Sequence, residues 1–75
     1  MSTNHEVSKN VKDVLTTLKG LIDEIIDAHD KLNDFINKKA PNGSIKDEDY
    51  SEYMELSIRF KDLTKRFSDV IEQKL

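Results

Sequence analysis

The sequence lacks cysteine and tryptophan, and its 75 residues include only one proline and two glycines. Without cysteine there is no disulfide framework, and two isolated histidines cannot complete a zinc site, so we expect neither of the usual staples of small domains. A chain of this length forms at most one small domain, which buries only about 60% of the surface that its unfolded form exposes. Stability is therefore scarce, and association with another polypeptide is the usual remaining remedy.

A basic excess and a long apolar run are also missing. The 12 Lys and Arg are outnumbered by 15 Asp and Glu, so nothing drives counterion release from nucleic acid, and we do not expect nucleic acid as the main partner. No apolar run approaches the roughly 18 to 20 residues of a membrane span. The segment 1–6 lacks the basic and apolar regions of a signal peptide, which predicts no membrane insertion and a cytoplasmic location.

One cluster of turn-forming residues, at 40–44, separates two long segments that contain no proline. In both segments apolar residues recur at alternating spacings of four and three, which is the seven-residue repeat of a helix that packs along one seam. In the first segment this seam comprises Val7, Val11, Val14, Leu18, Leu21, Ile25, Ala28, Leu32 and Phe35. In the second it comprises Tyr53, Leu56, Phe60, Leu63, Phe67 and Val70. A strand would need period two, so the pattern predicts two helices.

The ends of these helices carry recognisable signals. Thr3 and Glu6 fit a capping box at the first helix start. Pro41 disfavours helical geometry at the residue before it, which ends the first helix near position 39. Either Ser44 or Asp47 can cap the second helix.

A connection this short favours an antiparallel arrangement of the two helices. The predicted fold is all-α, a single domain (1–75) formed by an antiparallel two-helix hairpin with coiled-coil-like packing: helix about 4–39, turn 40–46, helix about 47–74. The predicted layers pair Leu18 with Val70, Leu21 with Phe67, Ile25 with Leu63, Ala28 with Phe60, Leu32 with Leu56 and Phe35 with Tyr53. Small side chains thus meet large ones, as an interdigitated core requires.

The first helix has more apolar surface than one partner helix can cover. Leu15, Ile22 and Ile36 form a third apolar column, and Ile26 lies beside it. Dimerisation into a four-helix bundle would bury this surface symmetrically, and helices of another protein would serve equally well. In the remaining alternative, the extra column packs within a lone hairpin.

The second helix carries an outward stripe formed by Tyr50, Met54 and Ile58. Scattered surface apolar residues are normal in folded proteins. Because Tyr and Met are favoured at interfaces, the alternative is that this stripe is a second contact surface for a partner helix or a second protomer.

Several polar residues were candidates for chemistry. His29 interrupts the third column beside the predicted position of Ser57, and we expect it half-buried and hydrogen-bonded to Ser57 or a nearby Asp, with a pH-sensitive contact or a metal ligand as the alternative. A line of carboxylates follows one side of the first helix: Asp23, Asp27, Asp30 and Asp34. Oxygen-ligand metal sites need carboxylates that converge, so we interpret this line as a solvated edge.

These features predict a non-enzymatic protein–protein interaction module, such as an adaptor, assembly factor or inhibitor, that binds itself, another protein or both. No cofactor, metal or small-molecule substrate is expected, because a bare hairpin offers no water-poor pocket for catalysis. The first alternative is a small nucleic-acid-associated regulator that acts as a dimer through Lys61, Lys65 and Arg66. Ten Lys against two Arg, with abundant Asn, Asp and Ile, is typical of AT-rich genomes such as those of many phages and low-GC bacteria.

The second alternative comes from a resemblance. The pair Leu56-Ser57 resembles the start of the Ser-x-x-Leu-Asp signature of short sporulation phosphatases, which are two-helix proteins of similar length. Phe60 and Lys61 occupy the Leu and Asp places, so the acid that the family uses is replaced by a lysine. The segment 18–23 is also similar to the first helix of chorismate mutases, but the third helix of that family is missing from these residues.

Overall fold

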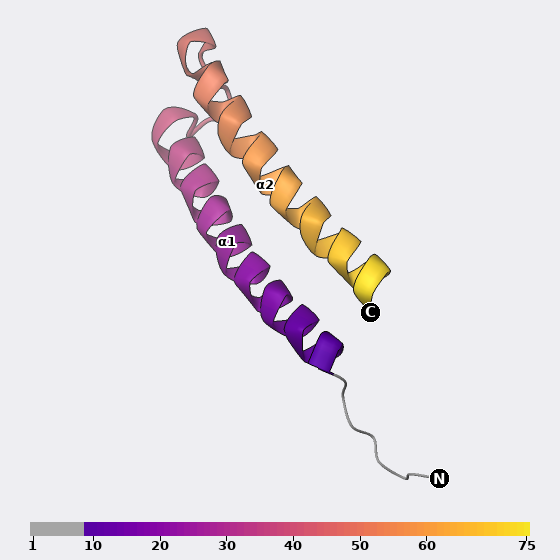
Figure 1. Cartoon of the computed structure of the whole chain (residues 1–75). Helices are drawn as coiled ribbons and strands as arrows, with labels where there is room; N and C mark the ends of the chain where they lie inside the picture. Colours follow the sequence, from indigo (N-terminus) through magenta and orange to yellow (C-terminus); the bar gives the residue numbers. More distant parts are fainter. Residues whose placement is uncertain (1–8) are drawn as a thin grey trace, which may run out of the picture.

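The computed structural model describes residues 9–75 and places nearly all of them in two helices. Helix α1 spans Lys9–Lys39 and helix α2 spans Asp47–Lys74. The helices pack side by side in opposite directions and form an elongated hairpin (Figure 1). The predicted all-α hairpin is therefore confirmed over 9–75. The helix start near residue 4, the capping box and the seam residue Val7 lie outside the described residues.

The turn begins where proline follows α1. The Ala40 N–H donates to the Ile36 carbonyl (2.8 Å), and the Gly43 N–H donates to the Ala40 carbonyl (2.8 Å). Gly43 has a φ of 84°, in the left-handed region that glycine adopts at little cost. Ala40 is buried, although the sequence marked it only as part of the turn. The turn is therefore packed onto the end of the seam.

The start of α2 corrects one prediction. Its N-cap is Lys46, in extended conformation, and no side chain caps the helix, so neither Ser44 nor Asp47 has the predicted role. Asp47 is already the first helical residue, and with Glu48 and Asp49 it places three negative charges on the positive end of the helix dipole. Charge in the first turn thus replaces a capping hydrogen bond.

The core is one seam deep. Its buried apolar residues are Leu18, Ala28, Phe35, Ala40 and Leu63. No large side chain within residues 9–75 is completely buried. Both helices therefore keep most of their circumference outside the seam, which sets the question of what covers it.

Candidate protein-interaction face

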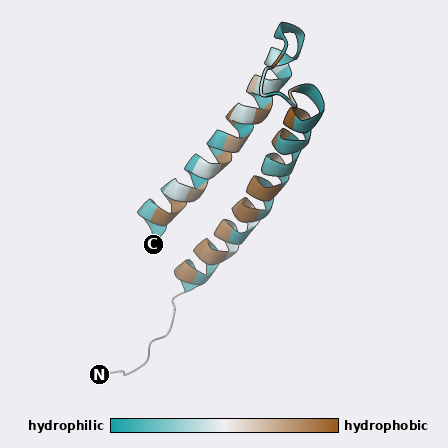
Figure 2. Cartoon of the chain, turned by 180° about the vertical axis from the view of Figure 1, so that it is seen from behind, coloured by the Kyte–Doolittle hydropathy of each residue, from teal (hydrophilic) through white to brown (hydrophobic). Residues whose placement is uncertain are grey.

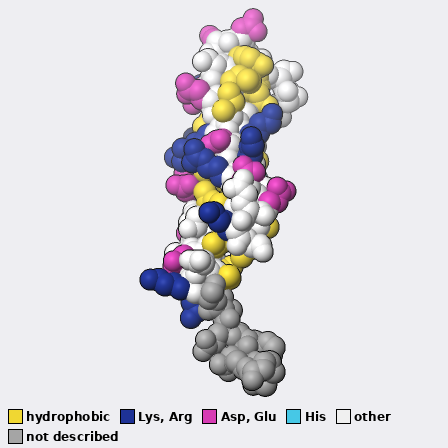
Figure 3. Space-filling view, turned by 45° about the vertical axis from the view of Figure 1, so that its right-hand side comes forward, with side chains coloured by type: hydrophobic (Ala, Val, Ile, Leu, Met, Phe, Trp, Pro, Cys, Tyr) yellow, Lys and Arg dark blue, Asp and Glu magenta, His cyan; other side chains and the backbone are white. Residues whose placement is uncertain are grey.

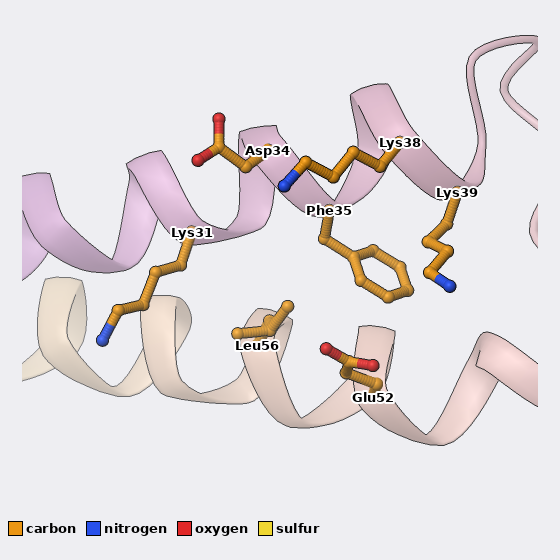
Figure 4. Close-up of a pocket in the computed structure, with 7 residues that line it drawn as sticks. All are labelled: Lys31, Asp34, Phe35, Lys38, Lys39, Glu52 and Leu56. Atoms are coloured by element: carbon orange, nitrogen blue, oxygen red, sulfur yellow. The ribbon is translucent and has the colours of Figure 1, made fainter.

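Two grooves follow opposite sides of the seam. One, of about 490 Å³, is lined by Leu32 of α1 and by residues of α2 that include Tyr50, Met54, Ser57, Ile58 and Lys61. The other, of about 320 Å³, has Phe35 and Leu56 between the helices and is edged by Lys31, Lys38, Lys39 and Glu52 (Figure 4). One side of the hairpin is thus apolar, and the opposite side is charged.

Helix geometry shows that the apolar side extends along the whole hairpin. In α1, Leu15 and Ile22 lie about 40° around the helix from the seam column of Leu18 and Ile25, and Ile26 lies about 100° from it. In α2, Tyr50, Ile71, Met54, Leu75 and Ile58 lie about 40° to 140° from the column of Tyr53, Phe60 and Phe67, in the same rotational sense. Because the helices are antiparallel, equal rotations from these columns lead to the same side of the hairpin.

All exposed large hydrophobic residues of the described chain lie on this side, which we call the apolar face. They are Leu15, Ile22, Ile26, Tyr50, Met54, Ile58, Ile71 and Leu75. Ile26 and Ile58 are the clearest cases, with 54% and 56% of their surface exposed. Hydrophobic residues recur along α1 (Figure 2), and hydrophobic side chains gather near the turn end of the hairpin (Figure 3). Of the residues predicted to bind a partner, only Ile36 is half-buried.

The structure brings together two surfaces that the sequence treated separately. The third column of α1 and the stripe of Tyr50, Met54 and Ile58 are parts of one face. Ile71 and Leu75 extend it at the open end of the hairpin and were not predicted as site residues. The signal was present in the sequence, because Ile71 follows Tyr50 by three heptads and so shares its position around α2.

Three polar residues interrupt the middle of the apolar face: His29, Ser57 and Thr64. The His29 side chain is 63% exposed, its Nδ1 lies 3.7 Å from Asp30 Oδ1, and its ring centroid lies 6.0 Å from that of Phe60. The predicted half-burial and hydrogen bond to Ser57 are therefore wrong, because the ring leans on Phe60 and its nitrogen turns toward Asp30. The Thr64 hydroxyl donates to the Lys61 carbonyl (2.8 Å), so it needs no further partner when covered.

Ion pairs within the chain lie away from the apolar face. Lys31 pairs with Asp27 and Arg66 pairs with Asp62, each at 3.1 Å along one helix. The predicted basic patch is thereby divided: Arg66 belongs to the charged side, whereas Lys61 and Lys65 edge the apolar face. Among residues 9–75, Asp23, Lys61 and Lys65 form no ion pair. The charges beside the apolar face are thus free to meet a partner.

The acidic line does not form a metal site. No group of three or more His, Asp or Glu side chains within 9–75 is arranged to hold a metal ion. Neither described helix has a stretch long and apolar enough to cross a membrane. The chain matches no protein family, no curated protein and no solved structure in comparisons with known proteins. Its geometry is therefore the basis for any functional proposal.

Proposed function

We propose that the protein is a non-enzymatic protein–protein interaction module, an adaptor, assembly factor or inhibitor, whose apolar face packs against helices of another polypeptide. One observation carries this proposal: every exposed large hydrophobic residue of the described chain lies on the same side of the hairpin. Randomly placed surface hydrophobic residues would occupy both sides, and contiguous exposed apolar patches mark interaction sites.

The thin core supports the same conclusion. A hairpin with one seam buries little apolar surface, and small domains without disulfides or metals gain stability by association. A helix with an apolar stripe wider than one seam is typical of a bundle in which each helix contacts two neighbours. The arrangement that we favour is therefore a four-helix bundle formed by self-association, and a heterologous helical partner is the alternative.

The experiment compares two matched double variants. Ile26→Asp with Ile58→Asp places two charges on the apolar face, one on each helix. Thr17→Asp with Gln73→Asp places the same charges on the opposite side, at exposed positions of the same helices. Circular dichroism establishes that both variants remain helical, and sedimentation equilibrium over a range of concentrations gives their mass beside that of the wild type.

We expect the apolar-face variant to lose association and the control to keep it, because only the first buries unpaired charges in the contact. If the wild-type chain is a monomer, the same variants are compared in pull-downs from the native host. A monomeric wild type that retains no protein sensitive to the apolar-face substitutions would overturn the proposed function.

A further inference from the structure

We propose that the apolar face is occupied by a second copy of this chain, with α1 of each copy against α2 of the other and both turns at the same end. This inference rests on the proposed interaction function and names its partner. It follows from the signs of the charges along the two outer edges of the apolar face.

The two edges carry opposite charge. On α1, Asp23 and Asp30 lie about 140° from the seam column, at the outer edge of the face. On α2, Lys65 lies at the equivalent angle and Lys61 lies just inside it. A two-fold rotation about the long axis of the hairpin places the acidic edge of one copy beside the basic edge of the other. A face that is complementary to itself in this way fits a second copy.

The heights of these residues along the hairpin agree with this arrangement. The stacked rings of Phe35 and Tyr53 fix the register of the two helices. Asp23 precedes Phe35 by twelve residues, and Lys65 follows Tyr53 by twelve, so the two residues lie at the same height. Because rotation about the long axis leaves heights unchanged, Asp23 of one copy meets Lys65 of the other twice in the dimer.

Two further pairs lie within one helical turn of the same height. In the dimer, Asp30 of one copy lies within a turn of Lys61 of the other, and Lys19 lies within a turn of Glu72. The terminal apolar residues Leu15 and Leu75 of different copies also come together at the open end. Charges and apolar residues therefore agree on one arrangement.

The competing face-to-face dimer has its turns at opposite ends and packs α1 on α1 and α2 on α2. When the two hairpins overlap along their full length, Asp23 then lies beside Asp30 of the other copy. Lys61 and Lys65 likewise lie beside the lysines of the other α2. Like charges facing each other disfavour this arrangement, so the edge charges select the dimer with both turns at one end.

A charge swap tests the pairing at low ionic strength. Asp23→Lys or Lys65→Asp alone turns two attractive contacts into repulsive ones, and we expect dimer dissociation constants about tenfold higher. The two substitutions together restore opposite charges across the dimer and should return the constant to near the wild-type value. Glu24→Lys is the matched control, because it makes the same change one residue later on the charged side.

A cross-link tests the geometry independently of these modest electrostatic effects. The chain has no cysteine, so Asn33→Cys with Ser57→Cys introduces the only two thiols. Asn33 lies toward the outer edge of α1 and Ser57 beside the seam of α2, at nearly the same height. Across the proposed contact they face each other, and mild oxidation should give a covalent dimer that neither single variant forms.

The outcomes separate this inference from the proposed function. A wild-type monomer at all concentrations overturns the second copy, while the pull-down comparison above still decides whether the apolar face binds another protein. A wild-type dimer that yields no cross-link with the paired cysteines, or that tightens on Asp23→Lys, overturns the arrangement and favours turns at opposite ends. A cross-linked dimer whose swap variant is restored supports the inference.

Discussion

The aromatic rings of Phe35 and Tyr53 stack across the hairpin, with centroids 6.5 Å apart and 29° between their planes. Phe35 is buried, and the two residues are the last predicted layer before the turn. This contact fixes how far α2 is shifted along α1. Every statement about residues at equal height, including the pairing of Asp23 with Lys65 between copies, depends on it.

Phe35→Ala should lower the free energy of unfolding by about 3 kcal/mol, because it removes a buried ring and leaves a cavity beside Tyr53. Chemical denaturation followed by circular dichroism measures this change. Asp34→Ala is the control, since Asp34 is the exposed preceding residue, and its effect should stay within about 0.5 kcal/mol. Equal effects of the two substitutions would show that the ring does not contribute to the core.

The neighbouring residues Ile25 and Ile26 should respond in opposite ways to the same substitution. Ile25 lies on the seam and is half-buried, so Ile25→Asp places an unpaired charge in the core and should abolish helical circular dichroism at room temperature. Ile26 points away from the seam, so Ile26→Asp should keep the helical signal and weaken only association. A stable, helical Ile25 variant would show that the seam is misplaced.

The fold could be predicted from the sequence because a single periodic signal specifies it. The spacing of four and three defines both seams, Pro41 ends α1, and the shortness of the turn leaves one register, which the contact between Phe35 and Tyr53 confirms. Predictions based on one residue's own hydrogen-bonding capacity were weaker. The caps at Ser44 or Asp47 and the bond from His29 to Ser57 depend on local backbone and rotamer choices that periodicity does not determine.

The candidate site could be predicted in part. Exposure of Leu15, Ile22 and Ile26 follows from their angle on α1, and exposure of the α2 stripe follows in the same way. That both surfaces form one face depends on how the two helices are rotated about each other. Only the packed hairpin shows this rotation, through a groove lined by Leu32 of one helix and Met54 of the other.

The absence of a side-chain cap at α2 offers a stabilising substitution. Lys46 occupies the N-cap, where its charge opposes the helix dipole and its side chain accepts no hydrogen bond. Lys46→Ser should raise the free energy of unfolding by about 1 kcal/mol, because the hydroxyl can accept a bond from an N–H of the first turn. Thermal and urea unfolding measure the gain. Lys74→Ser, at the other end of α2, is the control and should not stabilise the protein.

The two glycines should respond to alanine with opposite signs. A Cβ added at either Gly20 or Gly43 meets no atom within 4 Å, so packing does not distinguish them. Gly20 lies inside α1, where alanine restricts the unfolded chain and favours the helix, and Gly20→Ala should stabilise the protein by about 0.5–1 kcal/mol. Gly43 has a φ of 84°, which costs an L-residue about 1–2 kcal/mol. Gly43→Ala should therefore destabilise the turn by about that amount, as measured by urea unfolding. Equal shifts for the two variants would show that the left-handed turn is not required, and that the chain can reverse direction between Ala40 and Lys46 by another path.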